Sequence, residues 1–203
     1  MRGHLTDASG LSACLYQGMT RLLHLIKHAR PQIIPGLPAH EWSLAPAALD
    51  GIPHLAARLS PRPERVVSSE EGKARATAQA LAAHLGVPCR TMLGLHEHLR
   101  YTVPYRENAA DFEADIHAFF AAPDRIVLGE ESADDARTRF ANAVQAVMRA
   151  NTQGTLAIVA HGTVISLLVA QANHLDPLPL WSRLGLLDVL TVEWPGLKLR
   201  EES

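Results

Sequence analysis

The sequence predicts a three-layer α/β/α fold around a mostly parallel central sheet, with a small cap inserted over it. Short apolar segments alternate with longer segments of helical periodicity, and this alternation is typical of parallel strands joined by helices. The stretch 97–129 has little strand character and is expected to form the cap. A chain of 203 residues is long enough for one such domain with a sizeable core.

The expected elements follow in order from the apolar runs and from helical spacing. The strands are expected at Leu22–Ile26, Arg65–Val67, Val87–Met92, Thr155–Ala160 and Leu187–Glu193. The helices are expected at Pro46–Leu59, Glu71–Leu85, Ala109–Ala121, Ala133–Ala150 and Val164–Ala172. In the second of these helices the apolar residues recur at helical spacing, and Gly86 ends the pattern.

The composition excludes several classes of protein. The chain is 47% hydrophobic and 20% charged, and its formal net charge of -2 is not basic enough to indicate a nucleic-acid partner. No apolar run reaches the roughly 18 residues that a membrane helix needs, so no membrane partner is expected. Cys14 and Cys89 are too few for a disulfide framework, and a reducing cytoplasm is the expected location. The sequence does not predict the oligomeric state.

Residues 1–18 differ in character from the rest of the chain. The letters LSAC, at Leu11 to Cys14, resemble a lipoprotein cleavage box. The preceding MRGHLTDASG is polar, however, and a secretory signal needs an apolar segment of about 7–15 residues there. Residues 1–18 are therefore expected to be a loose extension, or the result of a start codon upstream of Met19, and residues 19–203 a single domain.

Three expected strands end in residues that suit an anionic ligand. The first ends in Lys27-His28-Ala29-Arg30, the second runs into the serines and the lysine of SSEEGK, and the fourth ends in His161-Gly162-Thr163. Ligands of open α/β sheets bind at the carboxyl ends of the strands, so these groups are expected on one rim.

Together these residues suit a phosphoryl group. The N–H groups of a helix N-terminus attract an anion, and nearby cations stabilise the charge on the equatorial oxygens of the transition state. A neutral histidine is also a legitimate covalent nucleophile. The candidate phosphate-binding groups are the side chains of Lys27, Arg30 and Lys73 and the helix start at Gly162 and Thr163.

Each of these motifs also has a plain structural explanation. A histidine at a strand end is more often structural than catalytic, and the chain has eleven histidines. Ser68 or Ser69 could cap a helix with Glu71 in its first turn, and Lys73 could be solvated. The HGT sequence could be a tight turn. The coincidence of three strand ends on one rim favours the functional interpretation.

In this order the motifs resemble those of the histidine phosphatase superfamily, the phosphoglycerate-mutase-like proteins. That family has Arg-His-Gly or Arg-His-Ala after its first strand, Ser-Ser with a basic residue after the second, and a histidine and glycine after a later strand. The segments LIKHARP, VVSSEEGKARATAQALAAHLG and AIVAHGTVISLL match these three motifs. Three further segments, EWSLAPAAL, GLHEH and GEESADDARTRF, also resemble segments of the family and occur in the family's order. The resemblance extends from about Met19 to Glu193.

The resemblance implies a role for each matching residue. His28 would be the nucleophile that becomes phosphohistidine, and His161 would be the second pocket histidine, either cationic or hydrogen-bonded to the phosphoryl oxygens. Lys27 and Lys73 lie where the family usually has two phosphate-binding arginines. Glu97 lies where the family often has its proton donor, and the cations around His28 would keep its imidazole neutral.

The lysines are a departure from the family, because arginine provides a planar bidentate clamp and lysine only a point charge. A second departure is the pair His96 and His98, which would share a face on a strand and could in principle bind a metal. No third ligand has a usual spacing, so neither a metal nor a cofactor is expected.

The leading expectation is a phosphatase, a phosphoric monoester hydrolase that acts on a small phosphorylated substrate. A mutase-type phosphotransferase ranks lower, because the segment after Glu97 is short and has few basic residues apart from Arg100 and Arg106. A non-catalytic phosphate-binding or interaction domain is the third alternative, supported by the loss of both arginines. Trp42, Tyr101, Tyr105 and the helix after Glu107 are expected to line the cap.

Overall fold

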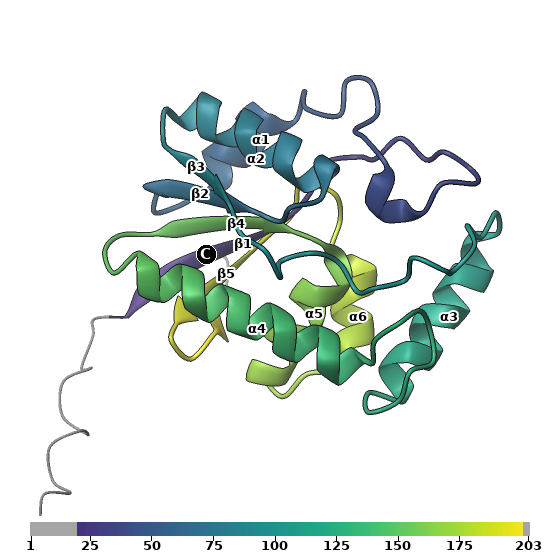
Figure 1. Ribbon diagram of the computed structural model, residues 1–203. Helices are drawn as coiled ribbons and strands as arrows, with labels where there is room; N and C mark the ends of the chain where they lie inside the picture. The colour runs from purple at the N-terminus through teal and green to yellow at the C-terminus, as the bar shows by residue number, and fades with distance from the viewer. Residues whose placement is uncertain (1–19, 201–203) are drawn as a thin grey trace, which may run out of the picture.

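The computed structural model describes residues 20–200 and has the expected α/β/α architecture (Figure 1). Its sheet has six strands in the order β3-β2-β4-β1-β5-β6. The strands are β1 (Arg21–Lys27), β2 (Arg65–Ser68), β3 (Cys89–Thr91), β4 (Leu156–Ala160), β5 (Val189–Trp194) and β6 (Lys198–Leu199). The helices are α1 (Ile52–Arg58), α2 (Gly72–Leu85), α3 (Ala109–Ala121), α4 (Ala133–Ala150), α5 (Gly162–Ala172) and α6 (Pro177–Arg183), with a short 3-10 helix, η1, at Ala39–Glu41.

The parallel part of the sheet brings three strand ends together. Strand β4 lies between β1 and β2, and it is parallel to both. Its residues are all buried, which explains its continuous apolar sequence LAIVA. Strands β3 and β2 are also parallel, whereas β5 and β6 are antiparallel to their neighbours. The carboxyl ends of β1, β2 and β4 therefore lie side by side on one edge.

Helices cover both faces of the sheet, and each face has its own apolar core. Helices α1 and α2 pack on one face, where Ile26 and Val159 meet Leu55 and Leu81. Helices α4 and α5 pack on the other, which includes Leu25 (Figure 1). Alternate β1 residues thus enter different cores, as the pleat of a strand requires.

The stretch expected to be a cap contains α3 and no strand. Asn108, the residue before α3, caps the helix: its side-chain oxygen accepts the N–H of Ala110. Ile116 and Phe119, on one side of α3, are fully buried and join the core that contains α4 and α5. Figure 1 shows α3 beyond the end of the sheet, near α6, so the cap is anchored at the same end of the molecule as the strand ends.

Some expected boundaries are wrong, for local reasons. The helix expected at Pro46–Leu59 begins only at Ile52, because Ala47 has a left-handed φ of 59° that ends helical geometry there. Strand β5 begins two residues late because Leu187 has a φ of 60°. Helix α6 was not expected; it has prolines at its start, where a missing N–H costs nothing.

Residues 1–19 and 201–203 lie outside the described residues, so the division into an extension of residues 1–18 and a domain of residues 19–203 stays a prediction. Within 20–200, no helix has the length and apolar character that crossing a membrane would require.

Candidate active site

Backbone hydrogen bonds bring the two strand-end histidines together. The N–H of His28, one residue beyond β1, donates to the carbonyl of Ala160 at 3.0 Å, and the N–H of Ser69 donates to Val159 at 2.9 Å. His161 follows Ala160 directly and begins α5. As a result, the ring centroids of His28 and His161 are 5.1 Å apart, with one ring edge toward the other.

The structure holds His28 in the form that a nucleophile needs. Its Nδ1 lies 2.7 Å from the carbonyl oxygen of Ala29, and a carbonyl can only accept, so Nδ1 carries the proton. Nε2 is then left with the lone pair. Burial, and to a lesser extent Lys73, lowers the pKa of His28 to about 4. The imidazole is therefore neutral at pH 7, chiefly because it is buried rather than because cations surround it.

His161 is fully buried, and its Nε2 is 2.9 Å from Ser69 Oγ and 3.5 Å from Glu71 Oε1. Burial, with His28 and Lys73 nearby, lowers the pKa of His161 well below its ordinary value. His161 is thus a neutral hydrogen-bonding group in this structure, and not a cation.

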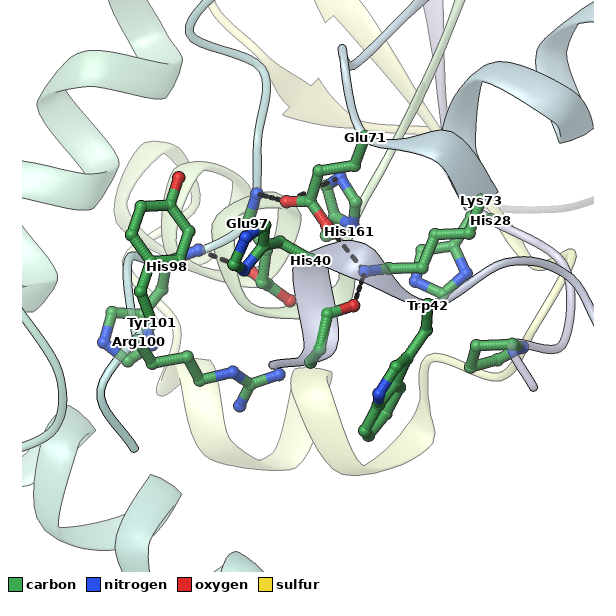
Figure 2. Close-up of a pocket in the computed structure, with 12 residues that line it drawn as sticks. His28, His40, Trp42, Glu71, Lys73, Glu97, His98, Arg100, Tyr101 and His161 are labelled. Atoms are coloured by element: carbon green, nitrogen blue, oxygen red, sulfur yellow. Dashed lines mark hydrogen bonds and ion pairs between the residues drawn. The ribbon is translucent and has the colours of Figure 1, made fainter. Parts of the chain in front are cut away.

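A cavity of about 110 Å³ opens beside the two histidines (Figure 2). Its wall combines strand-end residues with residues of η1 and of the cap. The lining residues are His28, Pro31, Ala39, His40, Trp42, Glu71, Lys73, Glu97, His98, Arg100, Tyr101 and His161. Four of the predicted site residues, His28, Lys73, Glu97 and His161, therefore share one cavity, and Trp42 and Tyr101, which were expected to line the cap, line this cavity too.

Lys73 is already paired inside this cavity. Its Nζ lies 2.6 Å from Glu71 Oε2 and 2.7 Å from the carbonyl of Ala39, and both charged side chains are buried (Figure 2). Glu71 Oε1 also accepts the N–H of Glu97 at 2.8 Å. From the sequence, Glu71 is expected only in the first turn of a helix, because nothing in SSEEGK indicates which glutamate faces the rim.

Glu97 occupies the N-terminus of α5. Its two carboxylate oxygens accept the N–H groups of Thr163 at 3.2 Å and Val164 at 3.3 Å. Burial disfavours its charge, whereas Arg100 and the N–H of His98 favour it, and the pKa of Glu97 lies below its ordinary value. Glu97 is therefore a carboxylate in this structure, and it fills the anion-binding position expected for Gly162 and Thr163.

The other two predicted cations lie outside the cavity. The side chain of Lys27 crosses Gly162 so closely that a Cβ added at residue 162 would lie 3.2 Å from Lys27 Cε. Its Nζ donates to the carbonyl of Leu184 at 2.7 Å. Arg30 is exposed and donates to the carbonyl of Pro46 at 3.2 Å. Lys27 thus lies next to the start of α5, but neither Lys27 nor Arg30 lines the cavity.

The segment with His96 and His98 is not a strand, so the two rings do not form a metal-binding face. His98 is buried, stacks on Phe119 with centroids 4.1 Å apart, and lies 2.6 Å from the carbonyl of Leu128 through Nε2. Nowhere in residues 20–200 do three histidine, cysteine or acidic side chains cluster as metal ligands would.

Arg139 of α4 fixes the loop that carries Glu97. Its guanidinium donates to the carbonyls of Gly94, His96 and Glu97 and forms an ion pair with Glu131 at 2.5 Å. Glu131 in turn accepts the N–H of Leu99 at 2.8 Å. Within the GEES motif, Glu131 therefore has a structural role: together with Arg139 it holds the loop that carries Glu97 in place.

We expect the buried histidine to make folding stability depend on pH. The pKa of His28 is lowered from 6.5 to about 4 in the folded protein. Between these two pH values the unfolded chain binds a proton at His28 and the folded chain does not. Stability is full above pH 6.5 and is lost as the pH falls toward 4. His28 should contribute about 2 kcal/mol of destabilisation between pH 7.5 and pH 5. Urea unfolding at both pH values measures this loss in the wild type and in His28→Asn.

The His28→Asn protein should lose about 2 kcal/mol less than the wild type over this interval, since other buried histidines such as His24 and His161 still contribute. An equal loss in both proteins would contradict the burial of a neutral His28.

Comparison with known proteins agrees with this geometry. The sequence model of the histidine phosphatase superfamily (branch 1) matches residues 40–197. No curated protein matches the chain significantly. Among solved structures, mycobacterial glucosyl-3-phosphoglycerate phosphatase superposes with a TM-score of 0.69 at 20% identity, covering 89% of this chain and 96% of that one.

Phosphoserine phosphatase from Entamoeba histolytica superposes with a TM-score of 0.71 at 17% identity, covering 90% of this chain and 95% of that one. A putative alpha-ribazole-5'-P phosphatase from Escherichia coli has a TM-score of 0.67 at 18% identity, with 90% and 95% covered. These likenesses show the shared fold, and the family match covers more than half of the sequence. The chain belongs to the histidine phosphatase superfamily, branch 1.

Proposed function

We propose that this protein is a phosphatase, which hydrolyses a small phosphomonoester through a phosphohistidine at His28. The observation that carries the proposal is the state of His28. It is neutral, its proton is held on Nδ1 by the Ala29 carbonyl, and it lines a cavity beside a second buried histidine. The family and the phosphatase names of similar structures support the same activity.

The reaction has two transfers. His28 Nε2 attacks phosphorus, the bond from phosphorus to the ester oxygen breaks, and the leaving oxygen takes a proton to become an alcohol. Water then attacks the phosphohistidine, the P–N bond breaks, and inorganic phosphate leaves with His28 neutral again. Lys73, His161 and the N–H groups at the start of α5 would stabilise the equatorial oxygens in both steps.

Glu97 is the proposed proton donor, and it must first acquire a proton. Its carboxylate accepts N–H groups at the start of α5 and lies near Arg100, and both contacts favour the charged form. A phosphoryl group bound at α5 would take over these N–H groups and add negative charge beside the carboxylate. Both changes raise the pKa of a carboxyl group. Glu97 could then give its proton to the leaving oxygen and recover it from the attacking water.

The cap supports a phosphatase over a mutase. Of the three arginines in residues 97–129, Arg106 forms an ion pair with Asp115 at 2.8 Å, Arg125 does not line the catalytic cavity, and only Arg100 does. A bisphosphate would need further cations there. We keep a reducing cytoplasm as the proposed location, a proposal supported only by the low cysteine content.

One observation favours a second candidate, a domain that binds phosphate without turnover. The pairing of Lys73 with Glu71 weakens the cation that would stabilise the transition state. Hydrolysis of a generic aryl phosphate by the purified protein separates the two candidates, since a non-catalytic domain would bind phosphate and release no alcohol.

Replacing His28 by alanine should abolish turnover, because no other lining group has a free imidazole nitrogen held in the same way. Steady-state assays with an aryl phosphate measure the loss, and rapid acid-free quenching of the wild type should trap acid-labile phosphate on His28. Vanadate should inhibit and a chelator should not, since the nucleophile is an imidazole. Substantial activity in His28→Ala would overturn the assignment of the nucleophile.

Replacing Glu97 by glutamine should slow alkyl phosphates more than aryl phosphates. An alkoxide is a strong base that needs the proton, whereas a phenolate with an electron-withdrawing group leaves without it. A general acid contributes roughly 10²–10⁴-fold, so a loss of that order is expected for the alkyl substrate. The ratio of kcat/KM for the two substrates measures this. Equal losses would assign Glu97 a positioning role, and no loss would exclude it as the acid.

Replacing Glu71 by glutamine should tighten the binding of vanadate and inorganic phosphate by about tenfold or more. The substitution removes a buried negative charge beside Lys73, and repulsion between unit charges about 4 Å apart is roughly 4 kcal/mol near a protein surface. Inhibition constants measure the change.

The matched control is Glu70→Gln, whose side chain accepts the N–H of Gly94 and does not line the cavity. Weaker anion binding in Glu71→Gln would mean that Glu71 holds Lys73 in its binding position, and the masking interpretation would be wrong.

A further inference from the structure

A second cavity, of about 280 Å³, adjoins the catalytic one and plays no part in the proposed chemistry. Its wall is formed by the loop before η1 and by the segment that leads into α3. Its apolar lining residues include Ile33, Leu37, Val103, Tyr105 and Phe112. The cavity is more than twice the volume of the catalytic one.

The two cavities adjoin each other. Ala39, Trp42 and Arg100 line both of them. The indole N–H of Trp42 donates to the carbonyl of Leu37 at 3.1 Å, so its polar edge is satisfied within the protein. Tyr105 packs edge-on against Trp42 with centroids 5.7 Å apart. An organic group attached to a phosphoryl at His28 would thus pass Trp42 and meet an aromatic wall.

Arg100 lies where the two cavities adjoin and lines both of them. Its guanidinium carbon lies 4.9 Å from the centroid of the Phe112 ring, and its Nη1 is buried with no hydrogen-bond partner among the described residues. A buried donor without a partner is costly. The ester oxygen or a phosphoryl oxygen of a substrate that spans both cavities would supply the missing acceptor.

The lining is mostly apolar, with Arg100, Arg106 and Glu107 as its charged members. Ile33 is 50% exposed and Leu37 is 39% exposed, although both are large aliphatic side chains. Exposed apolar residues gathered around a hollow, rather than scattered singly, are typical of a ligand site. Burying their free surface against an apolar group would be favourable, whereas most hydroxyl or charged groups of a sugar or a serine moiety would face these apolar side chains, away from Arg106 and Glu107.

We propose that this cavity binds the organic part of the substrate, and that the substrate is a phosphomonoester of an apolar alcohol the size of a bicyclic aromatic. This proposal rests on the proposed function, because it assumes that the phosphoryl group lies at His28. The size follows from volume, since an apolar cavity of about 150 Å³ holds one benzene ring. A space of about 280 Å³ has room for roughly two fused rings.

The test compares 2-naphthyl phosphate with phenyl phosphate, whose leaving groups have similar acidity and differ by one ring. Wild-type kcat/KM should favour the naphthyl ester at least about tenfold, since even one methylene in an apolar pocket is worth roughly 10-fold or more. A ratio near one would overturn the proposal while leaving the phosphatase function intact.

Two neighbouring variants form a matched pair. Leu37→Asn should reduce the naphthyl preference about fivefold, because it places an amide in the wall of the cavity. Ile34→Asn makes the same kind of change to an exposed residue of the same loop that does not line the cavity, and it should leave the preference unchanged. Equal effects in the two variants would contradict the proposed site.

A binding experiment separates failure of this inference from failure of the proposed function. If neither ester is hydrolysed, calorimetry with 2-naphthylmethylphosphonate and methylphosphonate still measures the contribution of the rings. Tighter binding of the naphthyl compound, lost in Leu37→Asn and kept in Ile34→Asn, would support the apolar site without catalysis. Equal binding of both phosphonates would overturn it.

Discussion

The site depends on the parallel pairing of β4 between β1 and β2. In this register Lys27 lies opposite Ala160 and Ser68 opposite Val159, and the hydrogen bonds of His28 and Ser69 extend both ladders by one residue. A slip of one residue in either pair would turn the strand-end side chains to the opposite face. The burial of β4 on both faces resists such a slip, since every one of its side chains has a place in a core. The distance between the two histidines therefore follows from sheet register rather than from any contact between their rings.

The charge inside the cavity is balanced, which is unusual for a site proposed to bind phosphate. Two cations, Lys73 and Arg100, face two carboxylates, Glu71 and Glu97, while the low pKa of His28 keeps that ring neutral. Lysine forms a point-charge contact and not the planar clamp of arginine, so a neighbouring carboxylate can hold it away from a ligand. An incoming phosphoryl group must replace internal anions instead of filling a vacant positive pocket. Affinity for the phosphoryl group alone is accordingly expected to be modest, and contacts to the organic part of the substrate gain importance.

The sequence could predict the strand ends but not the directions of the side chains that follow them. The apolar runs before His28 and His161 are strong signals, and the open-sheet rule places both on one rim. The difference between Lys27 and Lys73 has no such signal, because it depends on the Leu184 carbonyl and on Glu71, which only the tertiary structure brings near. The left-handed turn at Ala47 has no such signal either, whereas Gly51 and Pro53 are typical of the helix start that the structure has at Ile52.

Under the proposed function, the position of Glu97 couples substrate binding to acid catalysis. A carboxylate at a helix N-terminus is stabilised by the dipole and by free N–H groups, so the contacts of Glu97 with α5 add to those with Arg100 and the N–H of His98 in favouring its charged form. A phosphoryl group competes for the same N–H groups, and its charge penalises a second anion nearby. Phosphomonoesters have a second pKa near 6, so a bound monoanion can deliver the proton that the displaced carboxylate then holds. Glu97 would be an anion while it accepts the N–H groups of α5 and a neutral acid once a substrate has replaced it there.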